Sequence, residues 1–165
     1  MSDKRTVRLA VSMGDPRGIG PEVIAKALRE PQADVQLVVL GSAAVLGDAA
    51  SRLDSPPDLP VVDDVSEAGD RPAVVLDLDN FDPADLEPRR PDAASGRASL
   101  ESIERAVELV QGGQCDALVT GPISKEAIAA AGSKFPGHTE MLAHLGGVDN
   151  PIMLMACPGL RVALV

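Results

Sequence analysis

Short apolar runs of strand length alternate with longer amphipathic stretches along this chain. Strands are predicted over four runs rich in valine and leucine, at residues 6–12, 35–40, 73–78 and 116–120. Helices are predicted between and after these runs, at residues 21–29, 42–53, 97–111, 123–131 and 139–145. The run at 35–40 has a single polar residue, which is typical of a strand buried on both faces of a parallel sheet. The alternation predicts an α/β fold with helices on both faces of the sheet.

Three stretches interrupt this alternation. Residues 54–72 are rich in Asp, Pro, Ser and Gly and are predicted to be loop around one short strand at 59–62, and residues 80–95 form a second Pro- and Asp-rich excursion. The runs at 151–156 and 160–165 are predicted to form a hairpin, with the last run a buried strand. Domains usually end at solvent. This ending favours the interpretation that the chain is the first part of a longer protein, and the alternative is a terminal strand tucked into the sheet.

Composition narrows the function classes. The chain has 165 residues, a net charge of −10, no Trp, no Tyr and two Phe, which argues against a nucleic-acid partner because neither a basic stripe nor a stacking platform is available. No apolar run approaches the roughly 20 residues of a membrane-spanning helix, and residues 1–5 lead into a strand rather than a signal-peptide core. Two cysteines, Cys115 and Cys157, make no disulfide framework. We therefore expect a cytoplasmic protein without a membrane partner.

Candidate chemistry lies in three turns that open helices. The first, residues 14–22 (GDPRGIGPE), contains Gly14, Gly18 and Gly20 at a spacing that matches neither the dinucleotide fingerprint nor the phosphate loop. Its carboxylates, Asp15 and Glu22, would repel a phosphate. A tight turn that needs glycine for its backbone is the competing interpretation.

The second and third turns carry a cation and an imidazole. In residues 120–125 (TGPISK), Lys125 would lie in the first turn of a helix, where it could help to bind an anion or be a solvated surface lysine. In residues 135–140 (FPGHTE), His138 could bind a polar substrate or act as acid or base, although a loop histidine is more often structural. His144 and Glu140 are four residues apart and are predicted to pair on a helix surface. Two histidines and two distant cysteines make no metal-ligand set.

Together and in this order, the three turns resemble those of the 4-hydroxythreonine-4-phosphate dehydrogenase family of vitamin B6 biosynthesis. The resemblance covers residues 7–165 and the N-terminal half of the family. It implies a three-layer α/β/α fold of the isocitrate and isopropylmalate dehydrogenase type, here apparently truncated, with a first lobe over residues 1–128 and the start of a second over 129–165. The family works as a homodimer, with its active site in the cleft between the lobes.

The resemblance also implies a reaction. The family oxidises the 3-hydroxyl group of 4-phosphohydroxy-L-threonine with NAD or NADP, and the product loses carbon dioxide to give 3-amino-2-oxopropyl phosphate on the way to pyridoxal phosphate. A divalent metal (Zn, Mg or Co) polarises the alcohol, and its histidine ligands are expected beyond Val165. His138 and Thr139 match the substrate-binding pair, and Lys125 is given a hypothetical anion role. Arg17 stands where the family usually has a small residue.

Two alternatives to this function stay open. A paralogue could act on a 4-phosphorylated threonate or erythronate, or on a similar hydroxy acid, because the three turns do not separate these substrates. A catalytically inactive N-terminal fragment could instead bind only anions or a partner, and we expect the 165-residue chain alone to be inactive.

Overall fold

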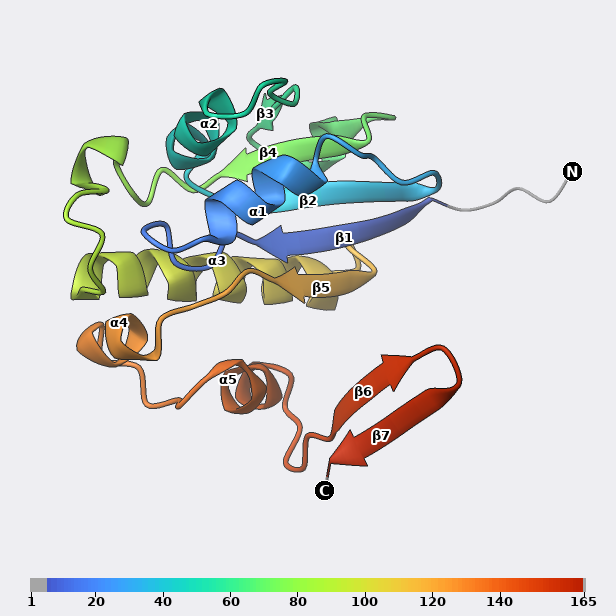
Figure 1. Ribbon diagram of the computed structural model, residues 1–165. Coiled ribbons are helices and arrows are strands. Elements are labelled where there is room, and N and C mark those ends of the chain that lie inside the picture. Colours follow the sequence, from blue (N-terminus) through green and yellow to red (C-terminus); the bar gives the residue numbers. More distant parts are fainter. Residues whose placement is uncertain (1–5, 165) are drawn as a thin grey trace, which may run out of the picture.

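The computed structural model describes residues 6–164, and Figure 1 shows a twisted sheet with helices on both faces and a separate hairpin. Within these residues the main sheet has five strands in the order β3-β4-β2-β1-β5, and every neighbouring pair is parallel. The strands are β1 (Val7–Ser12), β2 (Val35–Gly41), β3 (Val61–Val62), β4 (Ala73–Asp77) and β5 (Ala117–Thr120). The predicted α/β fold is therefore confirmed.

The helices divide between the two faces of the sheet (Figure 1). Alternate residues of β1, β2 and β4 follow this division, because Val11, Val39 and Val75 pack in one core with α1 (Gly20–Ala27) and α2 (Ala43–Ser51). Their neighbours Ala10 and Val38 pack in a second core against α3 (Ala93–Gln111). Both faces of the central strand β2 are therefore buried, as the apolar run at 35–40 predicted.

The remaining elements lie in the connections. Two short 3-10 helices, η1 (Val65–Ala68) and η2 (Pro83–Asp85), interrupt the loops on either side of β4, and α4 (Lys125–Ala130) and α5 (His138–Leu145) follow β5. No helix within residues 6–164 is long and apolar enough to cross a membrane. The predicted division into lobes at residues 128 and 129 stays a prediction.

Helix α3 begins earlier than the sequence pattern predicted. We expected an irregular excursion as far as residue 95, but the helix starts at Ala93. The carboxylate of Asp92 accepts a hydrogen bond from the Ser95 backbone N–H at 2.9 Å, and the Ser95 hydroxyl lies 3.4 Å from the Asp92 backbone nitrogen. This reciprocal cap satisfies backbone donors at the helix start and so moves the boundary back by about one turn.

The C-terminal hairpin forms as predicted, but its second strand is not buried. Strands β6 (Met153–Cys157) and β7 (Leu160–Leu164) pair antiparallel, with Met155 opposite Val162. Every residue of both strands is exposed, so the expectation of a buried final strand is wrong for the residues described here. The reason is that no described element covers either face of this two-stranded sheet. Val165, included in the predicted strand, lies outside the described residues, as do Met1 to Arg5.

Candidate functional site

Two of the three sequence turns contact each other at the carboxyl ends of β1 and β5. Gly14 has φ +78°, and a Cβ added to it would lie 2.3 Å from the carbonyl oxygen of Pro122. The Asp15 backbone N–H donates to that same oxygen at 2.9 Å. A Cβ on Gly121 would lie 2.3 Å from the Met13 carbonyl oxygen. Only glycine permits this approach of two backbones, so the glycines hold the first turn against the second.

The acidic side chains of the first turn have partners within their own segment. Asp15 is 5% exposed, and its carboxylate accepts a hydrogen bond from the Arg17 backbone N–H at 2.9 Å. The Asp15 carbonyl accepts from the Gly18 N–H. Glu22 lies on the outer surface of α1, where its carboxylate is 2.7 Å from the Lys26 ammonium, and this hydrogen bond lowers the pKa of Glu22. These contacts are those of a structural turn. Gly20 fits the same account, because a Cβ there would lie 2.2 Å from the Met13 carbonyl oxygen.

Arg17 anchors the first turn to the segment that precedes α3. Its guanidinium donates to the carbonyl oxygens of Asp85 and Arg90, each at 2.9 Å, and pairs with the Asp92 carboxylate at 2.5 Å. It also lies over the Phe81 ring, 5.5 Å from the centroid, and its side chain is 10% exposed. The Arg17 guanidinium thus makes its hydrogen bonds and its ion pair within the protein and joins the first turn to the segment before α3. The sequence pattern did not reveal this structural role.

Lys125 connects the second turn to the third. It is the first residue of α4, which begins where the Ser124 hydroxyl accepts a hydrogen bond from the Ala127 backbone N–H. The Lys125 side chain is exposed, and its Cε atom lies 3.8 Å from the position that a Cβ on Gly137 would occupy. The end of the Lys125 side chain therefore lies close to the start of α5.

His138 and Thr139 are the first two residues of α5, and both are half-buried. The Nε2 atom of His138 is buried and has no hydrogen-bond partner among residues 6–164. Burial lowers the pKa of His138, because the charged imidazolium is poorly solvated there. Helix α5 also begins without a side-chain cap, since Gly137 occupies the capping position. The N–H groups of its first turn therefore remain available to an acceptor, such as an anion.

His144 lies elsewhere on α5 and makes a different contact from the one expected. Its ring packs against the Phe135 ring, with the centroids 5.1 Å apart, and the residue is exposed. The predicted surface pair with Glu140 is not among the ion pairs found within residues 6–164. The two histidines of α5 are thus distinguished by burial, because only His138 has a buried ring nitrogen without a partner among residues 6–164.

One buried polar atom at this edge was not singled out from the sequence. The Ser12 hydroxyl, at the carboxyl end of β1, is fully buried and has no hydrogen-bond partner within the described part of the chain. Ser12 lies directly opposite Thr120 of β5, under the two turns that contact each other. A serine at the end of a strand carries no sequence signal that separates it from other core positions.

The described residues provide no metal centre. Among residues 6–164, no three side chains of His, Cys, Asp or Glu come together in a way that could hold a metal ion. The histidine ligands that the resemblance implies were expected beyond Val165, so the divalent metal stays a prediction and no chemical step is derived through it.

The fold and this edge define a class. The chain is a parallel α/β structure in which the turns at the carboxyl ends of β1 and β5 contact each other, the usual location of ligands in such sheets. Lys125 follows the second of these turns, and its side chain lies near Gly137, which precedes His138 and the uncapped start of α5. Within that class, the chain belongs to the family described as pyridoxal phosphate biosynthetic protein PdxA, whose profile matches residues 33–165. This confirms the resemblance carried by the three turns.

Relatives with two different names are similar to this chain. A 4-hydroxythreonine-4-phosphate dehydrogenase of Trichlorobacter lovleyi is 40% identical over 96% of this chain and 48% of its own. A D-threonate 4-phosphate dehydrogenase of Cupriavidus necator is 39% identical over 98% of this chain and 49% of its own. The crystal structure of a 4-hydroxythreonine-4-phosphate dehydrogenase from Burkholderia phymatum matches 95% of this chain and 48% of that one, with a TM-score of 0.84 and 39% identity. The chain spans about half the length of these relatives.

Proposed function

We propose that the protein to which this chain contributes is a cytoplasmic dehydrogenase of a 4-phosphorylated hydroxy acid, with NAD or NADP as the hydride acceptor. The preferred substrate is 4-phosphohydroxy-L-threonine, which would be oxidised at its 3-hydroxyl group and then lose carbon dioxide to give 3-amino-2-oxopropyl phosphate. The names of the relatives support this proposal.

The observation that carries the proposal is the buried, unpartnered Nε2 atom of His138 in the first turn of α5, a helix whose capping residue Gly137 lies near the Lys125 side chain. An unpaired buried polar atom is unfavourable by about 1–3 kcal/mol, and a ligand that pairs with it recovers that free energy. A polar group of the substrate would pair with Nε2, and an anionic group would lie near the Lys125 ammonium.

Each residue has a separate task in this arrangement. His138 stays neutral near pH 7 because burial lowers its pKa, so its ring offers one donor and one acceptor to the substrate. Lys125 contributes a positive charge, and the Thr139 hydroxyl and the N–H groups of the first α5 turn add hydrogen bonds. The nicotinamide would supply the hydride chemistry, while these side chains orient the substrate.

A second substrate is favoured by a specific observation. The relative named D-threonate 4-phosphate dehydrogenase is 39% identical, within one percentage point of the relative named for 4-hydroxythreonine 4-phosphate. D-threonate 4-phosphate and 4-phosphohydroxy-L-threonine share a terminal phosphate and a carboxylate. They differ at C2, which carries a hydroxyl group in the first and an amino group in the second. His138 and Lys125 would bind groups common to both.

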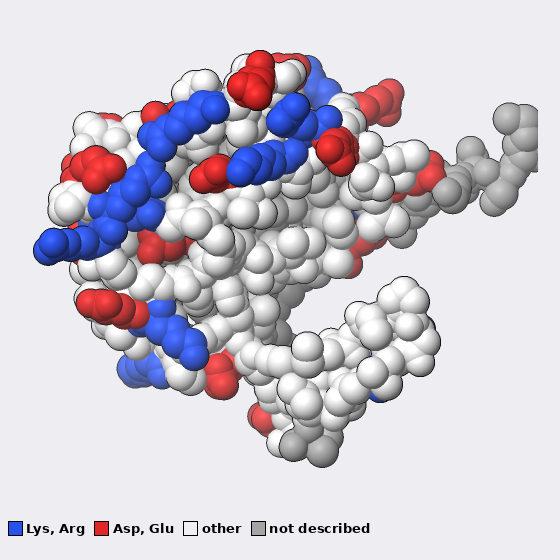
Figure 2. Space-filling view, in the orientation of Figure 1, with Lys and Arg blue, Asp and Glu red and all other residues white. Residues whose placement is uncertain are grey.

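A homodimer is the proposed assembly. The hairpin exposes large apolar side chains on both faces, and uncharged atoms dominate it in Figure 2. A two-stranded sheet is at most marginally stable in water by itself, so a covering surface would stabilise it. A second protomer would supply such a surface.

Binding measured with and without turnover tests the proposal. We would titrate 4-phosphohydroxy-L-threonine and D-threonate 4-phosphate into the protein by calorimetry, and follow NADH formation in the same samples. His138→Ala is expected to weaken binding about tenfold, the equivalent of one hydrogen bond to a buried atom. His144→Ala, the matched control on the same helix, is expected to change binding less than twofold.

Each outcome selects one interpretation. NADH formation supports the dehydrogenase. The substrate that is oxidised more efficiently then shows which of the two kinds of relative this protein resembles in its substrate preference. Binding without NADH formation supports the fragment that only binds anions. Equal effects of the two histidine substitutions would remove His138 from the site.

A further inference from the structure

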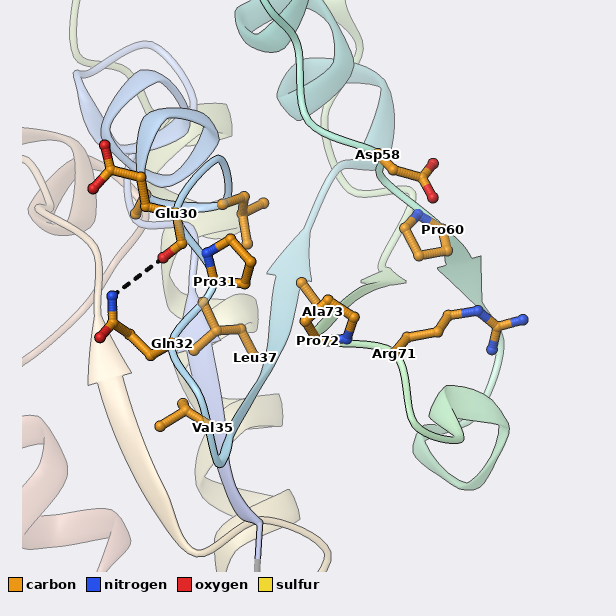
Figure 3. A pocket seen from close by; sticks show the side chains of 12 residues that line it. Glu30, Pro31, Gln32, Val35, Leu37, Asp58, Pro60, Arg71, Pro72 and Ala73 are labelled. Atoms are coloured by element: carbon orange, nitrogen blue, oxygen red, sulfur yellow. Dashed lines mark hydrogen bonds between the residues drawn. The ribbon is translucent and has the colours of Figure 1, made fainter.

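An apolar cavity opens at the amino ends of β2 and β4, at the opposite end of the strands from the candidate substrate site. Its volume is about 480 Å³, within the range of small-molecule sites. Figure 3 shows Pro31 and Leu37 on one side of it, facing Pro72 and Ala73 on the other. Nothing in the proposed dehydrogenase reaction uses this cavity.

Backbone hydrogen bonds fix the walls of the cavity to the sheet. The Pro72 carbonyl accepts from the Leu37 N–H at 2.9 Å, and the Pro60 carbonyl accepts from the Val75 N–H at 2.8 Å. Proline rings hold φ fixed, so these wall segments have little freedom to collapse into the space. A cavity with rigid walls binds a ligand without a large ordering cost.

Backbone donors in the walls are already used within the protein. Besides the Leu37 N–H, the N–H of Glu30 donates to the Ala27 carbonyl at 3.2 Å, and the N–H of Val35 donates to the Gln32 carbonyl at 3.3 Å. Prolines have no N–H to offer, and the lining includes three of them: Pro31, Pro60 and Pro72. A ligand that depends on many hydrogen bonds, such as a phosphate, is therefore disfavoured here.

The charged groups at this cavity do not point into it. Figure 3 shows the carboxylates of Glu30 and Asp58 and the guanidinium of Arg71 directed away from the space between the facing walls. The Arg71 guanidinium also donates to two backbone carbonyls of η1. A charged group inside the cavity would lose its hydration without gaining a partner, so a charge of either sign is unfavourable there.

We propose that this cavity binds a small, neutral aromatic compound. The flat ring system would lie between the two facing walls, in contact with Leu37 and Ala73. A flat, rigid body buries apolar surface against both walls at once and has little conformational freedom to lose. The binding free energy would come from apolar burial and not from ion pairs.

The chain itself makes a direct test possible. It has no Trp and no Tyr, so a fluorescent aromatic probe can be followed without a protein background. The probes share two fused six-membered rings and differ in charge at pH 7: neutral 2-naphthol, anionic 2-naphthalenesulfonate and cationic N-methylquinolinium. We expect saturable binding of 2-naphthol below millimolar concentration, about fivefold or more tightly than either charged probe, because a charge beside these walls loses hydration. The amide NMR signals of Leu37 and Ala73 are expected to shift in the same titration.

One substitution fills the cavity, and a matched one does not. Ala27 is the last residue of α1, is exposed and lines the cavity, so Ala27→Leu is expected to abolish saturable binding of 2-naphthol. Ala130 is the exposed last residue of α4 and lies outside this lining, so Ala130→Leu is expected to retain binding. Leu154→Lys removes an exposed apolar side chain of the hairpin and is also expected to retain it.

The proposal is overturned if 2-naphthol shows no saturable binding, if a charged probe binds as tightly, or if Ala27→Leu leaves 2-naphthol binding unchanged. Loss of binding in Ala130→Leu or Leu154→Lys would place the probe elsewhere on the protein and would overturn it as well. Because the cavity lies at the opposite end of the strands, none of these results depends on whether the protein is a dehydrogenase. His138→Ala is expected to leave 2-naphthol binding intact.

Discussion

Two strands of this protein have similar apolar sequences and opposite environments. In β2, Val38, Val39 and Leu40 are 0% exposed, whereas in β7 Leu160 is 59% exposed and Leu164 is 48% exposed. Both segments form strands, as their apolar runs predict. What differs is the set of neighbours, because β2 lies between β1 and β4 under helices on both faces, and β7 pairs with β6 alone in its sheet. An apolar run therefore predicts a strand, and burial depends on which other elements reach it.

The largest test of this comparison is the same substitution in both strands. Leu40→Ala removes a fully buried side chain from the core between β2 and α3, and is expected to lower the free energy of unfolding by about 2–5 kcal/mol. Leu160→Ala removes an exposed side chain of the hairpin, and at protein concentrations low enough to keep the chain monomeric it is expected to change the free energy of unfolding by less than about 0.5 kcal/mol. Urea unfolding of the two variants at equal protein concentration measures both values.

A large loss in Leu160→Ala would break the comparison. It would mean that the hairpin is covered in solution, by another copy of the chain or by another part of the protein. Repeating the measurement at several protein concentrations separates these causes, because only the first depends on concentration.

The main sheet could be predicted from the sequence because its signals are local. The apolar runs of β1, β2, β4 and β5 predicted the strand bounds to within about two residues. The start of α3 was missed because its reciprocal Asp92–Ser95 cap is not the Ser/Thr and Glu/Gln pair that usually marks a helix start. The apolar run of β7 by itself predicts a buried strand and so does not show its exposure, because burial depends on elements far away in the sequence.

The candidate site was predicted only in part, because some of its signals are local in the sequence and others are not. The three turns could be found by their glycines and by Lys125 and His138, since residue type and spacing carry that information. The contact between Asp15 and Pro122 joins residues more than one hundred positions apart, and the sequence gives no sign of it. The hydrogen-bond partners of Arg17 in other segments are 68 to 75 positions away, so the sequence indicated an unusual residue at this position but not its role.

Arg17 extends the comparison from apolar to charged side chains. Arg17→Ala would remove a guanidinium that is 10% exposed and would leave the carbonyls of Asp85 and Arg90 without that donor. We expect a loss of about 1–3 kcal/mol in the free energy of unfolding. Arg52→Ala breaks an exposed pair with Asp48 four residues away and is expected to cost at most about 0.5 kcal/mol. Similar losses for the two variants would show that the Arg17 contacts contribute no more than an ordinary surface pair.

The hairpin is expected to cause self-association. Its exposed side chains include Ile152, Leu154 and Met155, at 63%, 59% and 61% exposure, and exposed apolar strands recruit other chains. The net charge of −10 opposes association by repulsion, and salt screens that repulsion over about 8–10 Å. Light scattering is therefore expected to show larger particles at higher salt. Leu154→Lys is expected to reduce association, whereas Val23→Lys, an equal charge change at an exposed position of α1, is not. A monodisperse monomer at all salt concentrations would contradict this expectation.

The smallest expected effect concerns His138, in helix α5, which precedes the hairpin along the chain (Figure 1). Burial lowers the pKa of its imidazole in the folded protein below the ordinary value of about 6.5. As the pH falls below that value, the unfolded chain binds a proton at His138 before the folded chain does, so the free energy of unfolding decreases. Above it, His138 is neutral in both states and makes no such contribution.

His138→Gln is therefore expected to lose less stability than the unsubstituted protein between pH 7.5 and pH 5.5, as measured by urea unfolding. An NMR titration of His144→Gln, in which His138 is the remaining histidine, measures the pKa directly. A midpoint at or above 6.5 would mean that the ring is solvated, and the buried Nε2 atom would then no longer support a substrate-binding role.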